Sequence, residues 1–141
     1  MRYVLDNSVA MRWLLSSQKA TDQHYAEAVL HSMLEATAVV PQLWHLEAAN
    51  VLLTAEKRGE LTSADVDNFV TELVSLPIRT DNLTAHQVFG QTLGLARTYH
   101  LSSYDAAYLE LAIREKLLLA TLDKNLIKAA GKAGVGLYLV S

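Results

Sequence analysis

Four acidic residues occupy positions at which the surrounding sequence predicts a buried environment. Asp6 directly follows the apolar run Tyr3–Leu5, and Asp123 follows a second apolar run at Leu117–Thr121. Both runs are typical of buried β-strands. In open α/β sheets, functional groups gather at the carboxyl ends of parallel strands. We therefore expect these two aspartates to lie at the same edge of one sheet.

The other two acids are predicted to lie on the apolar faces of helices. On a helical wheel, the face that carries Asp105 also carries Leu101, Tyr108, Leu109 and Ala112. The face that carries Glu47 also carries Leu43, Trp44, Val51 and Thr54. By contrast, Glu110 is expected on the solvent side of its helix, in an i,i+4 pair with Arg114.

These positions predict a metal site, because an unpaired buried carboxylate costs several kcal/mol or shifts its pKa. Taken singly, Asp6 and Asp123 are also explained as helix N-caps. Asp105 and Glu47 are also explained as partners of buried arginines. If all four converge, they repel one another, and a divalent cation with oxygen ligands relieves the repulsion. The predicted ligands of this Mg²⁺ or Mn²⁺ ion are Asp6, Glu47, Asp105 and Asp123.

Such a site indicates phosphodiester hydrolysis. A bound divalent cation lowers the pKa of a water molecule and stabilises charge on a phosphoryl oxygen, so the same four acids are the expected catalytic residues. The net charge of −3 excludes a general affinity for nucleic acid. An anionic substrate would therefore have to meet the bridging cation or a local basic patch.

Three polar residues are placed to support these acids, and each has a second explanation. Ser8 either hydrogen-bonds a site carboxylate or a metal-bound water, or acts as a helix N-cap. Thr121 shares a strand face with Asp123, or is an ordinary β-branched strand residue. Asn50 lies one turn after Glu47, where it either orients that side chain or is a satisfied buried amide.

A basic stripe begins beside Asp123. Lys124, Lys128 and Lys132 recur at every fourth position of the helix that follows. They are candidates for contacts to RNA phosphates or form a solvated helix face. Arg12, one turn after Ser8, has the same two explanations. Three tyrosines are candidates for base stacking or for helix packing: Tyr99, Tyr104 and Tyr108.

Short apolar runs alternate with helical patterns along the chain. Strands are predicted at residues 3–5, 38–40, 78–80, 117–121 and 137–140. Helices are predicted at residues 9–15, 21–35, 43–58, 62–76, 84–99, 103–116 and 124–133. This alternation predicts an α/β fold with three α/β/α layers around a five-stranded, mostly parallel sheet.

Length and composition set further expectations. The 141 residues favour a single domain over residues 1–141. The absence of cysteine excludes disulfides and thiolate metal sites and fits a reducing compartment. No secretory signal or membrane-spanning run is visible, so we expect a soluble cytoplasmic protein.

An ordered set of motifs resembles a PIN domain, and among PIN domains it is most similar to the VapC-type toxins of toxin–antitoxin pairs. The motifs are Asp6-Asn-Ser8, Pro41 followed by Glu47 and Asn50, Leu101-Ser-Ser-Tyr-Asp105-Ala-Ala-Tyr, and Thr121-Leu-Asp123. The resemblance implies a five-stranded parallel sheet and an Mg²⁺- or Mn²⁺-dependent endoribonuclease. It also implies a cognate antitoxin, a homodimer, and the acidic site of Asp6, Glu47, Asp105 and Asp123.

The sequence departs from this family at one position. Many relatives have a further Asp two residues after the last acid, where this chain has Asn125. The site then carries one negative charge fewer, and the sequence is compatible with either one or two bound metal ions. Asn125 is placed to accept a hydrogen bond from a metal-bound water.

Two other functions compete with the ribonuclease. Asp6 at the end of the first strand also suits an aspartyl-phosphate phosphatase of the haloacid-dehalogenase type. The acid expected two residues later is replaced by Ser8, which weighs against this alternative. The third alternative is a catalytically silent interaction module with a PIN-like fold.

Overall fold

The computed structural model describes residues 1–140 and contains a parallel sheet of four strands in the order β3-β2-β1-β4. The strands are β1 (Arg2–Leu5), β2 (Thr37–Pro41), β3 (Ile78–Asp81) and β4 (Leu118–Ala120). β1 lies between β2 and β4, and Tyr3 is paired with Ala38 and with Leu118. The backbone N–H of Asp6 donates to the carbonyl of Ala120 over 2.9 Å. The carboxyl ends of β1 and β4 therefore lie side by side.

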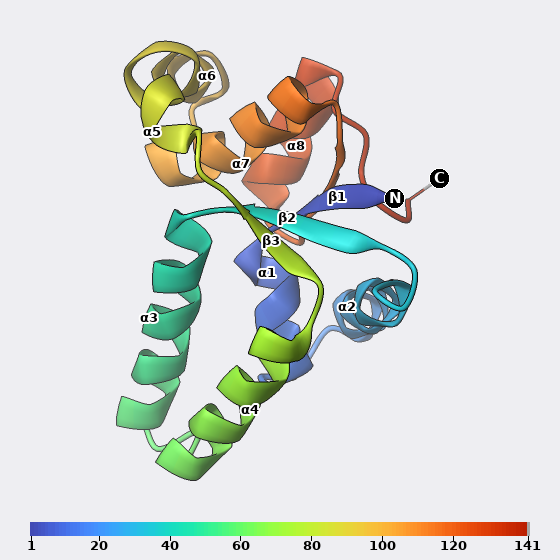
Figure 1. Cartoon of the computed structure of the whole chain (residues 1–141), viewed down its shortest axis with the longest axis vertical. Helices are drawn as coiled ribbons and strands as arrows, with labels where there is room; N and C mark the ends of the chain where they lie inside the picture. The colour runs from blue at the N-terminus through green and yellow to red at the C-terminus, as the bar shows by residue number, and fades with distance from the viewer. Residues whose placement is uncertain (141) are drawn as a thin grey trace.

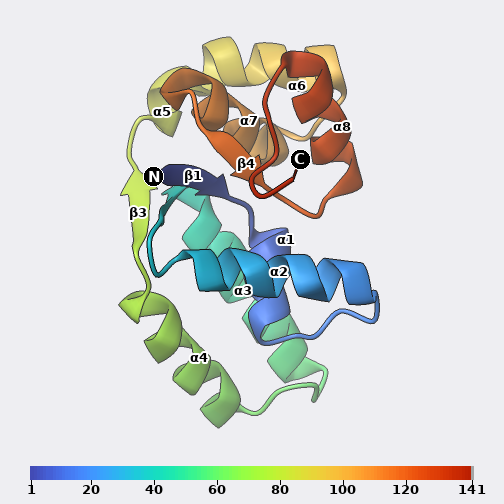
Figure 2. The ribbon, with the colours of Figure 1, turned by 90° about the vertical axis from the view of Figure 1, so that its right-hand side faces the viewer.

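Helices cover both faces of the sheet, and the predicted α/β class is confirmed. One layer contains α1 (Asn7–Ala10), α2 (Ala20–Ser32), α3 (Leu43–Lys57) and α4 (Ser63–Ser75). The other contains α5 (Thr84–Gln87), α6 (Leu93–Tyr99), α7 (Ser103–Glu115) and α8 (Lys124–Ala133). Figures 1 and 2 show the two layers on opposite sides of the strands. Within residues 1–140, no helix has the length and apolar character needed to cross a membrane.

The prediction of a fifth strand at residues 137–140 is wrong. Leu137 makes only an isolated parallel bridge to Leu119, and the chain then turns at Leu139, whose φ is 59°. The ring of Tyr138 instead stacks on Tyr3, with 3.9 Å between centroids. Its hydroxyl lies 2.9 Å from Ser32 Oγ, and its carbonyl accepts from the Tyr25 hydroxyl. Side-chain packing of Tyr138 thus takes the place of further strand pairing.

Two predicted helices differ in detail from the observed ones. The segment 84–99 is divided into α5, a π-helical turn at Val88–Thr92, and α6. Glycine weakens a helix interior, and Gly90 lies within this turn. The segment after β1 is helical from Asn7, two residues earlier than predicted, and ends as a 3₁₀ turn at Met11–Trp13.

The expected surface pair of Glu110 and Arg114 is in fact part of a buried ion-pair network, which corrects the prediction. Glu110 is only 4% exposed, and Arg114 Nε donates to its Oε1 over 2.8 Å. The same guanidinium donates to both carboxylate oxygens of Asp81 at the end of β3. This contact lowers the pKa of Asp81 below its ordinary value and raises that of Arg114. Arg114 therefore joins α7 to the edge strand of the sheet.

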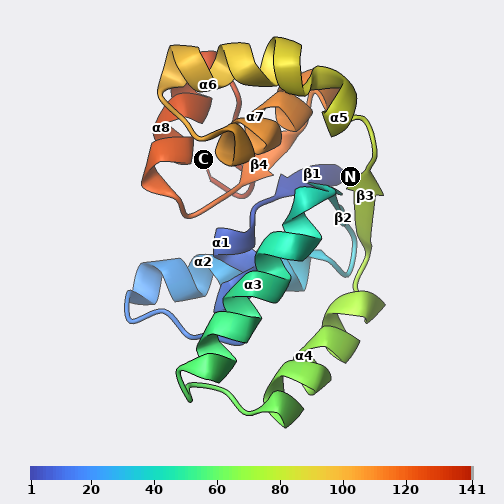
Figure 3. The same cartoon turned by 90° about the vertical axis from the view of Figure 1, so that its left-hand side faces the viewer.

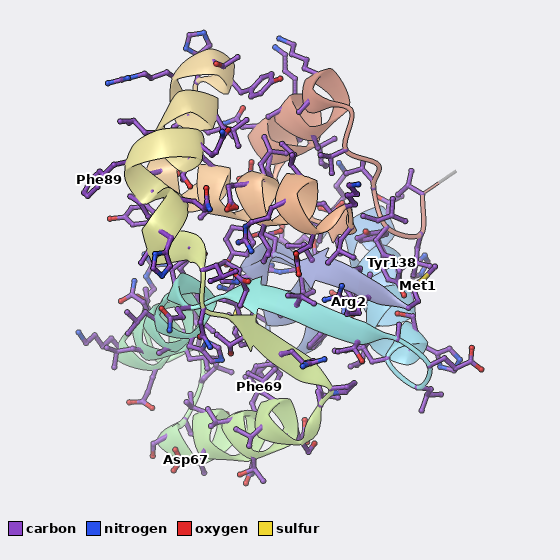
Figure 4. All side chains as sticks on the ribbon, turned by 45° about the horizontal axis from the view of Figure 1, so that its top comes forward. Met1, Arg2, Asp67, Phe69, Phe89 and Tyr138 are labelled. Carbon is purple, nitrogen blue, oxygen red and sulfur yellow. The ribbon has the colours of Figure 1, made fainter. Side chains whose placement is uncertain are left out.

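The pair of helices α3 and α4 extends away from the sheet (Figures 1 and 3). Phe69 of α4 is buried toward the sheet, whereas Asp67 points away from the molecule (Figure 4). Between the two helices lies an apolar cavity of about 370 Å³. Its lining includes Trp44, Ala48, Leu52, Leu73 and Val74, and Val74 is 80% exposed. The pair thus presents apolar surface to its surroundings.

Candidate active site

Asp6 is held in place by two hydroxyl groups at the end of β1. Ser8 Oγ donates to its Oδ2 over 2.6 Å, and Thr121 Oγ1 donates to the same oxygen over 2.8 Å. Asp6 is 6% exposed. Its pKa is raised, first by burial and also by the charge of Asp123, while the two hydroxyls oppose the rise. Asp6 is therefore a buried acid whose hydroxyl partners fix its orientation.

The alternatives for Ser8 and Thr121 are resolved by these contacts. Ser8 lies inside α1, whose N-cap position is Asp6, so the N-cap explanation of Ser8 is wrong. Ser8 Oγ instead accepts from the backbone N–H of Leu122 over 2.9 Å. Thr121 Oγ1 accepts from the backbone N–H of Asp123 over 3.1 Å. The two hydroxyls tie the segment after β4 to the segment after β1.

Asp123 is the N-cap of α8. Its Oδ1 accepts from the backbone N–H of Leu126 over 2.9 Å. The capping explanation is thus correct for Asp123, while the side chain of Asp6 makes no cap bond. Capping engages one oxygen of the carboxylate, and the charge of Asp123 still acts on Asp6 and Asp105.

Glu47 is oriented by two residues from other elements. The Tyr108 hydroxyl of α7 donates to its Oε1 over 2.6 Å, and Asn7 Nδ2 donates to the same oxygen over 3.4 Å. Asn7 also donates to the carbonyl of Trp44 over 2.9 Å, which holds α1 against α3. Burial raises the pKa of Glu47, and the charge of Asp6 adds to this effect.

Asp105 lies in the first turn of α7, after the N-cap Ser102. Burial is the largest of the effects that raise the pKa of Asp105 to about 6. The next effects are the negative charges of Asp123, Asp6 and Glu47, in that order. The charge of each of the other acids therefore acts on Asp105. Hydrogen bonds also link the segments that carry the acids: Thr121 contacts Asp6 and the backbone of Asp123, while Asn7 and Tyr108 contact Glu47.

The chemistry of this region fits a divalent cation. The facing groups are carboxylates, and within residues 1–140 no lysine or arginine forms an ion pair with any of the four. An oxygen-only donor set suits Mg²⁺ or Mn²⁺. In the described part of the chain, no three acids or histidines lie close enough to form a finished metal site. The fit to a cation therefore rests on the chemistry of the four carboxylates and on their missing cationic partners within residues 1–140.

The remaining predicted residues lie around this region. Asn50 is exposed, so it is not a buried amide. The hydrogen bonds to the Glu47 carboxylate come from Tyr108 and Asn7. Asn125 is exposed on α8, and Lys124, Lys128 and Lys132 are exposed on the same helix. Arg12 is half-buried in the 3₁₀ turn after α1, where its carbonyl accepts from Gln23.

Asn7 and Tyr108 were missed as supporting residues. Tyr108 follows Asp105 by three positions on the same helix face, so it looked like core packing, which is also true because it is fully buried. A sequence signal existed for Asn7, since an amide directly after Asp6 in a buried stretch needs polar partners.

The metal-free protein is expected to become more stable as the pH falls from about 7.5 to about 5.5. An acid with a raised folded-state pKa stabilises the fold fully below its unfolded value and loses this contribution as the pH rises through its folded value. For Asp105 this window runs from 3.8 to about 6. The gain is on the order of 1 kcal/mol after allowance for solvent screening.

Thermal unfolding in chelator at the two pH values measures this effect. Asp81, whose pKa is lowered, acts in the opposite direction but only below its ordinary value of 3.8. Asp105→Asn should flatten the pH dependence. A melting temperature that drops between pH 7.5 and 5.5 in the unmodified protein would show that the pKa of Asp105 is not raised in the folded state.

Removing the Tyr108 hydroxyl is expected to weaken the site without unfolding the protein. Tyr108→Phe keeps the buried ring but deletes the 2.6 Å hydrogen bond to Glu47. Loss of a residue that orients a metal ligand typically costs about 10- to 100-fold in metal affinity or activity. For the metal-dependent nuclease that the sequence predicts, the metal concentration for half-maximal activity should rise accordingly. Tyr104→Phe, on the same helix but 64% exposed, is the matched control.

Comparison with known proteins agrees with this geometry. The PIN domain model matches residues 3–132. PAE2754 from Pyrobaculum aerophilum has a similar structure, with a TM-score of 0.65 and 23% identity over 92% of this chain and 79% of the other. VapBC2 from Rickettsia felis gives 0.64 and 16%, with 98% of each chain covered. FitAcB from Neisseria gonorrhoeae gives 0.59 and 18%, with 98% of this chain and 96% of the other covered.

At these identities the three structures show a shared fold. No curated protein matches the chain in sequence. The family model, however, spans β1 to α8 and includes all four acids. On this match the chain belongs to the PIN domain family.

Proposed function

We propose that this protein is an Mg²⁺- or Mn²⁺-dependent endoribonuclease and the toxin of a toxin–antitoxin pair. PIN domains are in general nucleases, and the chain is a PIN domain. The observation that carries the proposal is the grouping of Asp6, Glu47, Asp105 and Asp123 through shared hydrogen-bond partners, without an ion-paired lysine or arginine in residues 1–140. The pKa of Asp6, Glu47 and Asp105 is raised, first by burial and then by the charge of neighbouring acids.

The chain's own residues position the acids that would hold the cation. Ser8 and Thr121 fix the carboxylate of Asp6, and Tyr108 and Asn7 fix that of Glu47. Asp105 and Asp123 lie at the starts of α7 and α8, which bring their charges toward Asp6. A bound divalent cation supplies activation of water and stabilisation of charge on the phosphoryl oxygen.

Preorganisation is the main contribution of the protein in this proposal. Because the hydroxyl groups hold the carboxylates before substrate arrives, little reorganisation is needed during the reaction. Any proton transfer would be made by a carboxylate. Tyr108 is unsuited to it, because burial and the hydrogen bond to Glu47 raise the pKa of its hydroxyl.

The proposed partners are an RNA substrate, a protein antitoxin and a second copy of the chain. The likeness to VapBC2 covers nearly the whole of both chains and supports the VapC-type toxin. Exposed apolar side chains on α3 and α4 support a protein partner, because contiguous apolar surface commonly marks an interface. They include Leu46, Leu53, Val70 and Val74. We place this function in the cytoplasm, where RNA is the accessible substrate.

A cleavage assay tests the proposal. Purified protein is incubated with single-stranded and structured RNA in Mg²⁺, in Mn²⁺ or in chelator, and products are separated by length. We expect internal cleavage with either metal and none in chelator. Cleavage that continues in chelator would overturn the metal requirement, and no cleavage of any RNA would favour the silent interaction module.

The aspartyl-phosphate phosphatase gains no support from the site. Its mechanism needs a second acid near Asp6, and the corresponding residue, Ser8, donates a hydrogen bond to Asp6 Oδ2. This contact engages the oxygen on that side of the carboxylate. A phosphoester assay with trapping of phospho-Asp6 is expected to yield no labelled protein.

A further inference from the structure

A small pocket lies beside the candidate active site, between the end of α6 and the outer face of α8. Its volume is about 180 Å³. The lining residues are Tyr99, His100, Asn125, Lys128, Ala129 and Lys132. Figure 3 shows the turn from α6 to α7 next to α8. The pocket is therefore formed by the end of α6, which precedes Asp105 in the chain, and by α8, which follows Asp123.

The charge of this pocket suits an anion. Lys128 and Lys132 are exposed and one helical turn apart, and neither forms an ion pair within residues 1–140. Like charges at i,i+4 repel one another and destabilise a helix slightly. A phosphate between the two ammonium groups would relieve the repulsion. The side-chain amide of Asn125 adds hydrogen-bonding groups at the same pocket.

The aromatic side of the pocket suits a nucleobase. Tyr99 is half-buried and packs against the hydrophobic core, so its ring is a fixed wall of the pocket. His100 ends α6 with a φ of 55°, and it lines the same pocket. Aromatic rings on which bases stack, combined with basic groups along the backbone, are the usual components of single-strand binding sites.

The pocket residues also lie a short distance along the chain from two of the acids. Asn125 follows Asp123 by two residues, and His100 precedes Asp105 by five. With a rise of about 1.5 Å per residue, Lys128 lies roughly 7.5 Å and Lys132 roughly 13.5 Å from Asp123 along the axis of α8. A strand whose phosphate lies at the acids would thus continue along α8 and reach the pocket.

We propose that this pocket binds one nucleotide of single-stranded RNA next to the phosphate that is cut. Lys128 and Lys132 contact its phosphate, and the base packs against Tyr99. The inference rests on the proposed ribonuclease function and adds a binding position for the nucleotide beside the cut, formed by the residues of this pocket. Bases within an RNA duplex are not free to stack on a side chain, so the pocket selects unpaired RNA.

Binding measured without cleavage tests this proposal separately from the nuclease activity. Fluorescence anisotropy of a labelled single-stranded oligoribonucleotide is recorded with the Asp6→Asn protein in Mg²⁺ over a range of salt concentrations. In that background, Lys128→Gln with Lys132→Gln should lower the slope of log affinity against log salt by about 0.7, since the two lysines neutralise one phosphate and each single-strand phosphate contact contributes about 0.7.

The aromatic wall has its own variant and its own signature. Tyr99→Ala should weaken binding on the order of 10- to 100-fold with the salt slope unchanged, because stacking is not a counterion effect. Tyr99→Phe keeps the ring and should bind as tightly as the parent. This pair of variants separates loss of stacking from loss of the hydroxyl, and circular dichroism confirms that Tyr99→Ala is folded.

A matched control removes the same charge elsewhere. Lys19→Gln with Lys57→Gln replaces two exposed lysines outside the pocket, and the salt slope should stay near that of the parent. An equal loss in this control, equal affinity for duplex RNA, or unchanged RNA affinity in the pocket variants would each overturn the proposal. Unchanged RNA affinity in the pocket variants would overturn the proposal even if the two lysines were found to bind an acidic peptide. Pocket-dependent binding by a protein that never cleaves RNA would overturn the nuclease function alone.

Discussion

Replacing Asp6 with Asn is expected to reduce the rate of RNA cleavage by roughly 100- to 1,000-fold while leaving the protein folded. The new side chain has the same shape, and its carbonyl oxygen can still accept from Ser8 and Thr121. What is lost is the negative charge nearest the centre of the acidic region. A metal ion supplies several kcal/mol of charge stabilisation in the transition state, and each 1.36 kcal/mol corresponds to a factor of ten in rate.

The same substitution should stabilise the metal-free protein. It is therefore expected to lower the cleavage rate and to raise the melting temperature in chelator. Asp6 is buried and its charge raises the pKa of both Glu47 and Asp105, so removing it relieves repulsion. The melting temperature in chelator should therefore rise, and the rise produced by added Mg²⁺ should shrink. Asp67→Asn, on the exposed face of α4 (Figure 4), is the control and should change neither quantity. Full cleavage activity in Asp6→Asn would show that Asp6 is not part of the active site.

Arg114→Ala is expected to lower the free energy of unfolding by about 3–5 kcal/mol. The substitution leaves the buried carboxylate of Glu110 and the half-buried one of Asp81 without their cation, with side-chain exposures of 4% and 10%. Breaking a buried ion pair by removing one partner costs this much because the remaining charge is uncompensated. Such a loss is a large part of the 5–15 kcal/mol typical of a domain, and denaturant unfolding measures it.

Two comparisons show whether the uncompensated charge is the cause. Arg97→Ala removes an exposed arginine from α6 and should change stability by no more than about 0.5 kcal/mol. Combining Arg114→Met with Glu110→Gln and Asp81→Asn removes all three charges and should recover most of the lost stability. If the triple variant is as unstable as Arg114→Ala, packing of the arginine rather than its charge explains the effect.

The sheet edge with Asp6 and Asp123 could be predicted because its signal is local. In both places an apolar run ends directly at an acid, and the α/β alternation predicts parallel strands whose carboxyl ends share one edge. The helix acids were also placed from a local pattern, since Asp105 and Glu47 interrupt apolar helix faces. That these residues form a site is still a proposal, whereas the hydrogen bonds that link their elements are part of the structure.

The errors occurred where partners distant in sequence decide the outcome. Glu110 and Arg114 look like a surface pair because their spacing is that of one, and only Asp81, 33 residues from Arg114, makes the pair part of the interior. The segment at 137–140 has the composition of a strand, but Tyr138 stacks on Tyr3 and the chain turns. Asn50 has the correct spacing to orient Glu47, yet Tyr108 of another helix already does so.

The pairing of β1 with β4 has a consequence for when the site exists during synthesis. The hydroxyl of Thr121 contacts Asp6 across 115 residues of sequence, and β1 cannot complete its pairing until β4 has been made. Contacts between such distant segments form late, after the cost of closing the long intervening loop has been met. A growing chain that has made β1, β2 and β3 therefore carries Asp6 and Glu47 but no assembled acidic site. The proposed activity can begin only once the ribosome has finished β4 and released it to fold, so a half-made copy is harmless to the RNA that encodes it.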